Sequence, residues 1–203
     1  IAAGPVAPQG AKVAIATYGD LKTAVSNWLY RDDLTSLIPD FITLAESAIR
    51  QDVRMRAMEQ TASGTLSSST LALPTRFAEA RRVILGTTPQ RYLTPEQFYP
   101  FRESDTDHYT ILGTNFLFQV SSGDYQVDYW QWFAPFADSG DTNTLLTNHP
   151  DVYLFAALAE AFQYIGGDST VWLAKYQAAL QRLRRAEAKM AGPLTVRPDI
   201  TVV

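Results

Sequence analysis

The chain has 203 residues, of which 46% are hydrophobic and 19% charged, a composition typical of folded globular proteins. It contains no cysteine, which excludes disulfide scaffolds, thiolate zinc sites and cysteine nucleophiles. Its 17 basic and 21 acidic residues give a net charge of -4, which argues against a dedicated nucleic-acid-binding protein.

The first 16 residues are expected to form an arm. They are rich in proline and glycine, and they lack the charged start and apolar core of a signal peptide. The longest apolar run, residues 152–159, is far shorter than the roughly 20 residues that cross a bilayer. We therefore expect no association with a membrane.

Two amphipathic helices are predicted within residues 17–60, because apolar residues recur with the helical period. The apolar positions of the first helix are Leu21, Ala24, Val25, Trp28 and Leu29. Thr17 or Asp20 is expected to cap it. Those of the second helix are Leu37, Ile38, Phe41, Ala45, Ala48 and Ile49, with Pro39 in the first turn, where a missing N–H is harmless.

A β-rich insertion is predicted over residues 61–147. Residues 61–70 are nearly all Ser, Thr and Gly, which indicates a mobile loop or a weak hairpin. The strands and the one short helix that follow are expected at 71–74, 80–85, 95–101, 109–112, 116–120 and 125–133. The last strand alternates, with aromatic residues on both faces and with Trp130 and Trp132 on one of them, which indicates burial on both sides or an interface.

Two further helices are predicted within residues 148–191. One begins at Pro150 and ends at Gly166-Gly167, and Asp168 can cap the next. In that last helix Trp172, Tyr176, Ala179, Leu183, Ala186 and Met190 form a packing seam.

An extended arm, residues 192–203, is expected after Gly192-Pro193. Leu194, Val196, Ile200, Val202 and Val203 make it too apolar for a freely solvated tail. Their spacing suits a strand that pairs with a partner's sheet edge. These residues, with Trp130 and Trp132, are the candidate interface with a portal protein or a neighbouring subunit.

The predicted fold class is mainly α with a β-rich insertion (α+β). Its core would be a four-helix bundle, with the β subdomain between the second and third helices and an extended arm at each end.

No constellation for catalysis is found, so no enzymatic activity, cofactor or metal is expected. Glu103, Asp105, Asp107 and His108 offer oxygen ligands for a cation, but the spacing of a calcium loop is absent, which favours a polar loop. A hydrolase with carboxylate chemistry is an alternative, because the pairs Asp32/Asp33 and Asp138/Asp141 could act as acid and base. Asp is, however, favoured in turns because its side chain bonds its own backbone.

Two groups of basic residues lie near predicted helix ends: Arg50, Arg54 and Arg56, and then Arg182, Arg184, Arg185 and Lys189. Cations at helix C-termini interact favourably with the helix dipole, so solvated helix ends explain both groups. Contact with DNA, or with an acidic partner for the second group, is the alternative.

Three stretches together resemble head-to-tail adaptor proteins of tailed bacteriophages in order and spacing. They are LIPDFITLAESAIRQDVRMR at 37–56, LALPTRF at 71–77 and NHPDVYLFAALAEA at 148–161. The resemblance runs from about Thr17 to Met190 and does not include the first 12 residues.

This resemblance implies a structural virion protein of the neck region, assembled in the host cytoplasm. Such proteins form twelve-fold rings beneath the portal protein, with extended C-terminal arms. The expected partners are other copies of the chain, the portal protein and a tail or nozzle protein, with no sequence-specific binding of nucleic acid. The ring would leave a channel for DNA ejection, through which a negatively charged subunit lets DNA pass. A non-viral helical interaction module is the alternative.

Overall fold

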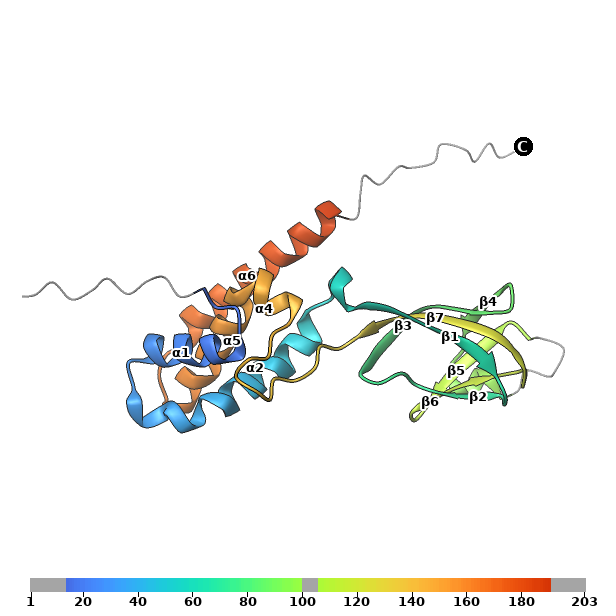
Figure 1. Cartoon of the computed structure of the whole chain (residues 1–203), viewed down its shortest axis with the longest axis horizontal. Coiled ribbons are helices and arrows are strands. Elements are labelled where there is room, and N and C mark those ends of the chain that lie inside the picture. The colour runs from blue at the N-terminus through green and yellow to red at the C-terminus, as the bar shows by residue number, and fades with distance from the viewer. Residues whose placement is uncertain (1–13, 100–105, 191–203) are drawn as a thin grey trace, which may run out of the picture. The chain divides into compact units, whose positions relative to one another are not determined.

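The computed structural model of the chain describes residues 14–99 and 106–190. The chain divides into two compact units (Figure 1). Residues 1–53 and 135–203 belong to the first unit, and residues 54–134 form the second. Each unit has its own secondary structure and core.

The first unit is helical. Its elements are α1 (Tyr18–Leu29), the 3-10 helix η1 (Asp32–Leu37), α2 (Ile38–Asp52), α4 (Thr144–Asn148), α5 (Pro150–Tyr164) and α6 (Thr170–Met190). The predicted Thr17 cap of α1 is confirmed, because its side chain accepts the backbone N–H of Asp20 in a capping box. Pro39 also lies in the first turn of α2, as predicted.

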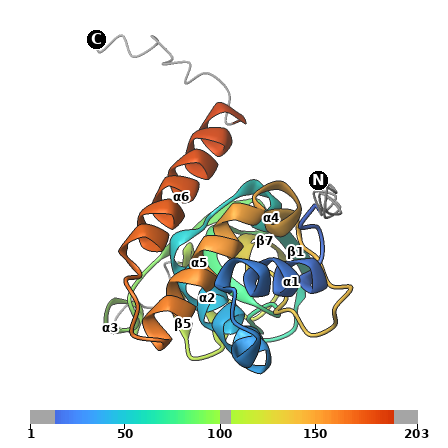
Figure 2. The same cartoon turned by 90° about the vertical axis from the view of Figure 1, so that its left-hand side faces the viewer.

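Helix α5 is the centre of the helical unit, packed against α1, α2 and α6 (Figure 2). Its buried residues lie all around the helix rather than on one stripe: Val152, Tyr153, Leu154, Ala156, Ala157, Leu158, Ala159 and Ala161. A helix that is apolar all round is one that neighbours cover on several sides. Its many alanines allow those neighbours to approach closely.

The segment that returns from the sheet packs on the helical unit. Phe136 lies between the rings of Tyr18 and Tyr153, with a centroid distance of 5.2 Å to each. The buried Glu46 carboxylate accepts the backbone N–H of Phe136 at 3.2 Å. Burial raises the pKa of Glu46 above its usual value, although this hydrogen bond and the charge of Arg50 oppose that shift.

The second unit is built around a seven-stranded sheet. Its elements are the 3-10 helix η2 (Arg56–Met58), β1 (Glu59–Leu66), β2 (Thr70–Ala72), β3 (Phe77–Leu85), β4 (Thr88–Tyr92), α3 (Pro95–Phe98), β5 (His108–Leu112), β6 (Asn115–Phe118) and β7 (Gly123–Gln131). The strand order is β1-β7-β3-β4-β5-β6-β2. Neighbouring strands are antiparallel except for β4 and β5, which are parallel.

The sheet is nearly closed and barrel-like, and one of its faces encloses a core. The buried residues of that core are Leu66, Val83, Leu85, Tyr109, Phe116, Phe118, Val127 and Tyr129. The predicted hairpin of β5 and β6 is confirmed, although its loop is Gly113-Thr114 rather than three residues, since Leu112 pairs with Asn115. Gly113 has φ of 60°, a conformation that glycine adopts without strain.

The predicted fold class is wrong. The protein is a mixed α/β fold in which the nearly closed sheet is a compact unit with its own core, not a small insertion in a four-helix bundle. The main error concerns residues 61–70, predicted to be a loop or weak hairpin. Most of them belong to β1, whose eight residues all pair with β7. Pairing with β7 makes this segment a strand, although its Ser- and Thr-rich sequence does not by itself predict one.

Within the described ranges, every helix is too short or too polar to cross a lipid bilayer.

Candidate functional site

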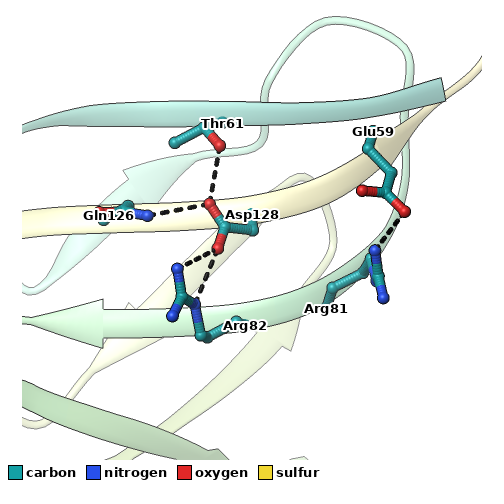
Figure 3. Close-up of polar contacts among 6 residues, drawn as sticks. All are labelled: Glu59, Thr61, Arg81, Arg82, Gln126 and Asp128. Carbon is teal, nitrogen blue, oxygen red and sulfur yellow. Dashed lines mark hydrogen bonds and ion pairs between the residues drawn. The ribbon is translucent and has the colours of Figure 1, made fainter. Parts of the chain in front are cut away.

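The outer face of the sheet carries a network of polar side chains where β1, β7 and β3 lie side by side (Figure 3). We call it the polar face and define it by Glu59, Thr61, Arg81, Arg82, Gln126 and Asp128. An open depression of about 630 Å³ lies along these residues.

Asp128 on β7 is the centre of the polar face. Thr61 Oγ1 donates to its Oδ1 at 2.7 Å and Gln126 Nε2 donates to the same oxygen at 3.0 Å. Arg82 Nε donates to Oδ2 at 2.8 Å. The hydrogen bonds from Gln126 and Thr61, followed by the contact with Arg82, hold the pKa of Asp128 below its usual value. The carboxylate therefore fixes the lateral alignment of three strands.

Two consecutive arginines contribute to the polar face because β3 contains a bulge. The pairing register of β3 with β7 shifts between Ala80 and Arg82, which leaves Arg81 as an extra residue. Arg81 forms an ion pair with Glu59, and its guanidinium lies 4.9 Å from the ring centroid of Trp130. A regular strand would direct neighbouring side chains to opposite faces.

The predicted interface residues Trp130 and Trp132 are half-buried. An arginine covers each ring: Arg81 lies over Trp130, and the Arg54 guanidinium lies 4.4 Å from the centroid of Trp132. Arg54 Nε also lies 4.0 Å from a carboxylate oxygen of Glu79. The guanidinium is attracted to the face of the tryptophan ring, and tryptophan and arginine are both residue types enriched among the residues that dominate binding at protein interfaces.

A second surface lies on the helical unit, where four aromatic rings from three helices gather. We call this the aromatic patch and define it by Trp28 of α1, Phe155 and Phe162 of α5, and Trp172 and Lys175 of α6. Trp28 lies 5.6 Å from Trp172 and 6.1 Å from Phe155 between ring centroids. Lys175 Nζ lies 4.4 Å from the centroid of Trp172, and Trp28 is 44% exposed.

Further apolar side chains of the same helices are exposed. Tyr30, at the C-terminal end of α1, is 94% exposed, and Val171 and Leu173 of α6 are about half exposed. Asn27, Trp28 and Tyr30 line an open depression of about 350 Å³. Exposed apolar surface of this kind marks sites of protein association. Trp28 was predicted on the apolar face of the first helix and Trp172 in a packing seam, so the patch itself was not predicted. The crowding of Trp28, Leu29 and Tyr30 at one helix end was the available signal.

The basic residues of α6 are partly engaged within their own unit. Arg182 Nη2 lies 2.5 Å from Asp151 Oδ2, and Arg184 Nη2 donates to the backbone oxygen of Asp52 at 3.2 Å. Tyr176 donates its hydroxyl to Asp52 Oδ2 at 2.9 Å. These contacts give Arg182 and Arg184 a structural role that needs no DNA.

The candidate catalytic and metal residues that the structure describes are not assembled into a site. Asp141 accepts the N–H groups of Ala137 and Asp138, which is the predicted turn role, and Asp33 pairs with Arg31. His108 Nδ1 lies 3.0 Å from Asp107 Oδ1. Across residues 14–99 and 106–190, no three His, Asp or Glu side chains are grouped as metal ligands. Glu103 and Asp105 lie outside the described residues.

The candidate interface residues of the C-terminal arm, Leu194, Val196, Ile200, Val202 and Val203, also lie outside the described residues.

Comparison with known proteins adds the identity of the family. No curated protein matches the chain. The model of the SU10 adaptor protein family matches residues 16–197, nearly the whole length. The resemblance to phage adaptors is thereby confirmed, and the chain belongs to the SU10 adaptor protein family, a family of phage head-to-tail adaptors.

Proposed function

We propose that the protein is a structural subunit that closes into a ring of twelve copies between the portal protein and the tail of its phage. Membership in a phage adaptor family is the observation that carries this proposal. A virion neck component of this kind needs no active site. The ring would be assembled in the host cytoplasm, and its channel would let DNA pass during ejection.

The two surfaces described above support assembly. Trp28 of the aromatic patch is exposed together with Tyr30 and Val171 of the same helices, and apolar side chains gathered on one surface suit contact with another protein. Beside the polar face, the sheet unit offers Trp130 and Trp132, each with an arginine guanidinium against its ring. Two different surfaces on one chain suit a heterologous contact, in which one patch of each copy meets a different patch of the next. Repetition of such a contact closes a ring when the rotation is a whole fraction of a turn.

Charge supports a channel for DNA. The net charge of -4 keeps a ring of many copies from binding the phosphate backbone tightly, since strong binding needs a surplus of Lys and Arg. We place the C-terminal arm, residues 192–203, at the portal protein or at a neighbouring subunit.

The test is to mix the purified chain with the portal protein of its phage and to measure the mass of the complex. The expected complex holds a number of copies near twelve, visible as rings in negative stain. One or two copies for each portal assembly would contradict the proposal.

A further inference from the structure

Strand β1 has one edge that is not paired within the described part of the chain. It stands at one end of the strand order and pairs with β7 only, while β2 stands at the other end. In a strand, the backbone N–H and C=O groups of alternate residues point to the same side. About half of the eight residues of β1 therefore direct their backbone groups away from β7.

Among the described residues, this edge lacks several of the features that usually prevent strand pairing. Proteins protect edge strands by making them short, by placing lysine or proline in them, or by bulges. β2 is short, with three residues, but β1 has eight, none of them lysine or proline, and its pairing with β7 is regular throughout. Six of its residues are exposed: Glu59, Gln60, Thr61, Ser63, Gly64 and Thr65.

The first half of β1 is the more accessible part of the edge. Only residues 67–69 separate Leu66 from β2, so β2 stays near the Leu66 end. Leu66 is buried there, whereas Glu59, Gln60 and Thr61 are exposed. Within the sheet unit, the Leu66 end is therefore the part of β1 that is least open to an added strand.

The sequence of the C-terminal arm is suited to this edge. Residues 199–203 read Asp-Ile-Thr-Val-Val, and four of these five are β-branched residues, which favour strands. They follow Pro198, which has no N–H to contribute to a sheet. Ile200 is ten residue steps from Met190 at the end of α6, a stretch of chain that can extend up to about 33 Å.

We propose that residues 199–203 of one copy pair with β1 of the neighbouring copy and add an eighth strand to its sheet. This inference rests on the proposed ring. Each copy then offers one strand and one edge, so a head-to-tail series continues until the ring closes. Backbone hydrogen bonds provide the attachment, as in other cases of strand addition. Ile200 and Val202 share one face of the added strand and lie on the core side, beside Ala62 of β1.

The absence of cysteine from the chain permits a direct test. Ser63→Cys and Thr201→Cys are introduced together into the full chain, and the protein is treated with a short bis-maleimide, with and without the portal protein of its phage. Ser63 is exposed and lies on the same face of β1 as Thr61. The expected result is a ladder of covalent dimers and higher oligomers on a denaturing gel.

Two controls make this result specific. The first control combines Thr88→Cys with Thr201→Cys, which places the first thiol at an exposed position of β4. Because β4 has partner strands on both edges, this pair should give less than a tenth of the cross-linked oligomers. Adding Ile200→Asp to the Ser63/Thr201 pair should abolish the ladder without lowering the melting temperature. A ladder of equal strength from Thr88, cross-linking only within one chain, or no ladder would each overturn the proposal.

Mass measurement of the same samples separates this inference from the proposed function. Rings of about twelve copies without a Ser63 ladder would refute the strand pairing and leave the ring intact. A ladder without closed rings would refute the ring and retain the pairing. Monomers without a ladder would refute both.

Discussion

Arg82 and Asp128 face each other across β3 and β7, with Nε of the arginine 2.8 Å from Oδ2 of the carboxylate. Thr61 reaches the other oxygen of Asp128 from β1, so one carboxylate connects three strands. These strands form one end of the sheet, and β1 is the strand whose edge is open. The polar face therefore holds in place the strand to which we assign the neighbouring arm.

Asp128→Asn should destabilise the sheet and reduce its sensitivity to acid. The folded-state pKa of Asp128 is lowered, so its contribution is complete above the unfolded pKa of about 3.9 and is lost as pH falls through the folded value. At pH 7 we expect a loss of about 1 kcal/mol in the free energy of unfolding, because the site is partly open to solvent. Urea unfolding at pH 7 and pH 3 measures both effects.

The matched control for this variant is Asp32→Asn, an exposed aspartate of η1. It should change neither the stability at pH 7 nor the difference between the two pH values appreciably. If both variants lower the free energy of unfolding equally, the hydrogen bonds around Asp128 contribute no more to stability than an exposed aspartate does.

Glu46→Gln should have the opposite effect on pH dependence. Burial raises the folded-state pKa of Glu46, so the folded protein binds a proton more readily than the unfolded chain. The contribution of Glu46 to stability is therefore greatest below the pKa that it has in the unfolded chain, and it declines as pH rises through its pKa in the folded protein. Glutamine keeps an oxygen that can accept the N–H of Phe136 without carrying charge.

We therefore expect Glu46→Gln to be at least as stable as the unmodified chain at pH 7 and to lose this advantage near pH 4. Thermal melting at a series of pH values measures this difference. A variant that is much less stable at pH 7 would show that the charge of Glu46 is needed in the helical unit.

Core substitutions should report separately on the two units. Leu158→Ala removes a fully buried side chain of α5 and should cost about 2 to 5 kcal/mol, and Phe116→Ala in β6 should cost about 3 to 5 kcal/mol. Hydrogen exchange should rise mainly in the helices for the first variant and mainly in the strands for the second. If both variants accelerate hydrogen exchange equally throughout the chain, the two units unfold as one.

Tyr30 and Val171, the exposed side chains on the same helices as the aromatic patch, should contribute to assembly and not to folding. Tyr30→Asn retains a residue that tolerates the φ of 51° at this helix end, and Val171→Ser removes a second exposed apolar side chain. The double variant should keep its melting temperature and weaken ring formation by at least about tenfold, or 1.4 kcal/mol. Tyr92→Ser, at an exposed tyrosine of β4, is the control that should leave assembly unchanged. Unchanged assembly of the double variant would show that Tyr30 and Val171 do not belong to the interface.

The helices were predictable because their signals are local. The Thr17 cap, Pro39 in the first turn of α2 and the start of α5 at Pro150 all follow from short stretches of sequence. The sheet was less predictable because its order depends on contacts between distant residues. β1 is polar and exposed at six of its eight positions, so only the pairing with β7 makes it a strand.

The candidate interface was predictable only in part. Alternation along the predicted strand at 125–133 placed Trp130 and Trp132 on one face, but the arginines that cover them come from other segments, one through a bulge at Arg81. The aromatic patch needs three helices to meet before Trp28 lies beside Trp172. Such arrangements arise from tertiary packing of distant segments, so no pattern within one stretch of sequence predicts them.

The central claim is that this adaptor closes into a ring against the portal protein, and native mass spectrometry of that complex tests it most directly. The account predicts a single species with a number of copies near twelve. A complex with one or two copies, or a chain that remains monomeric beside the portal protein, would contradict it.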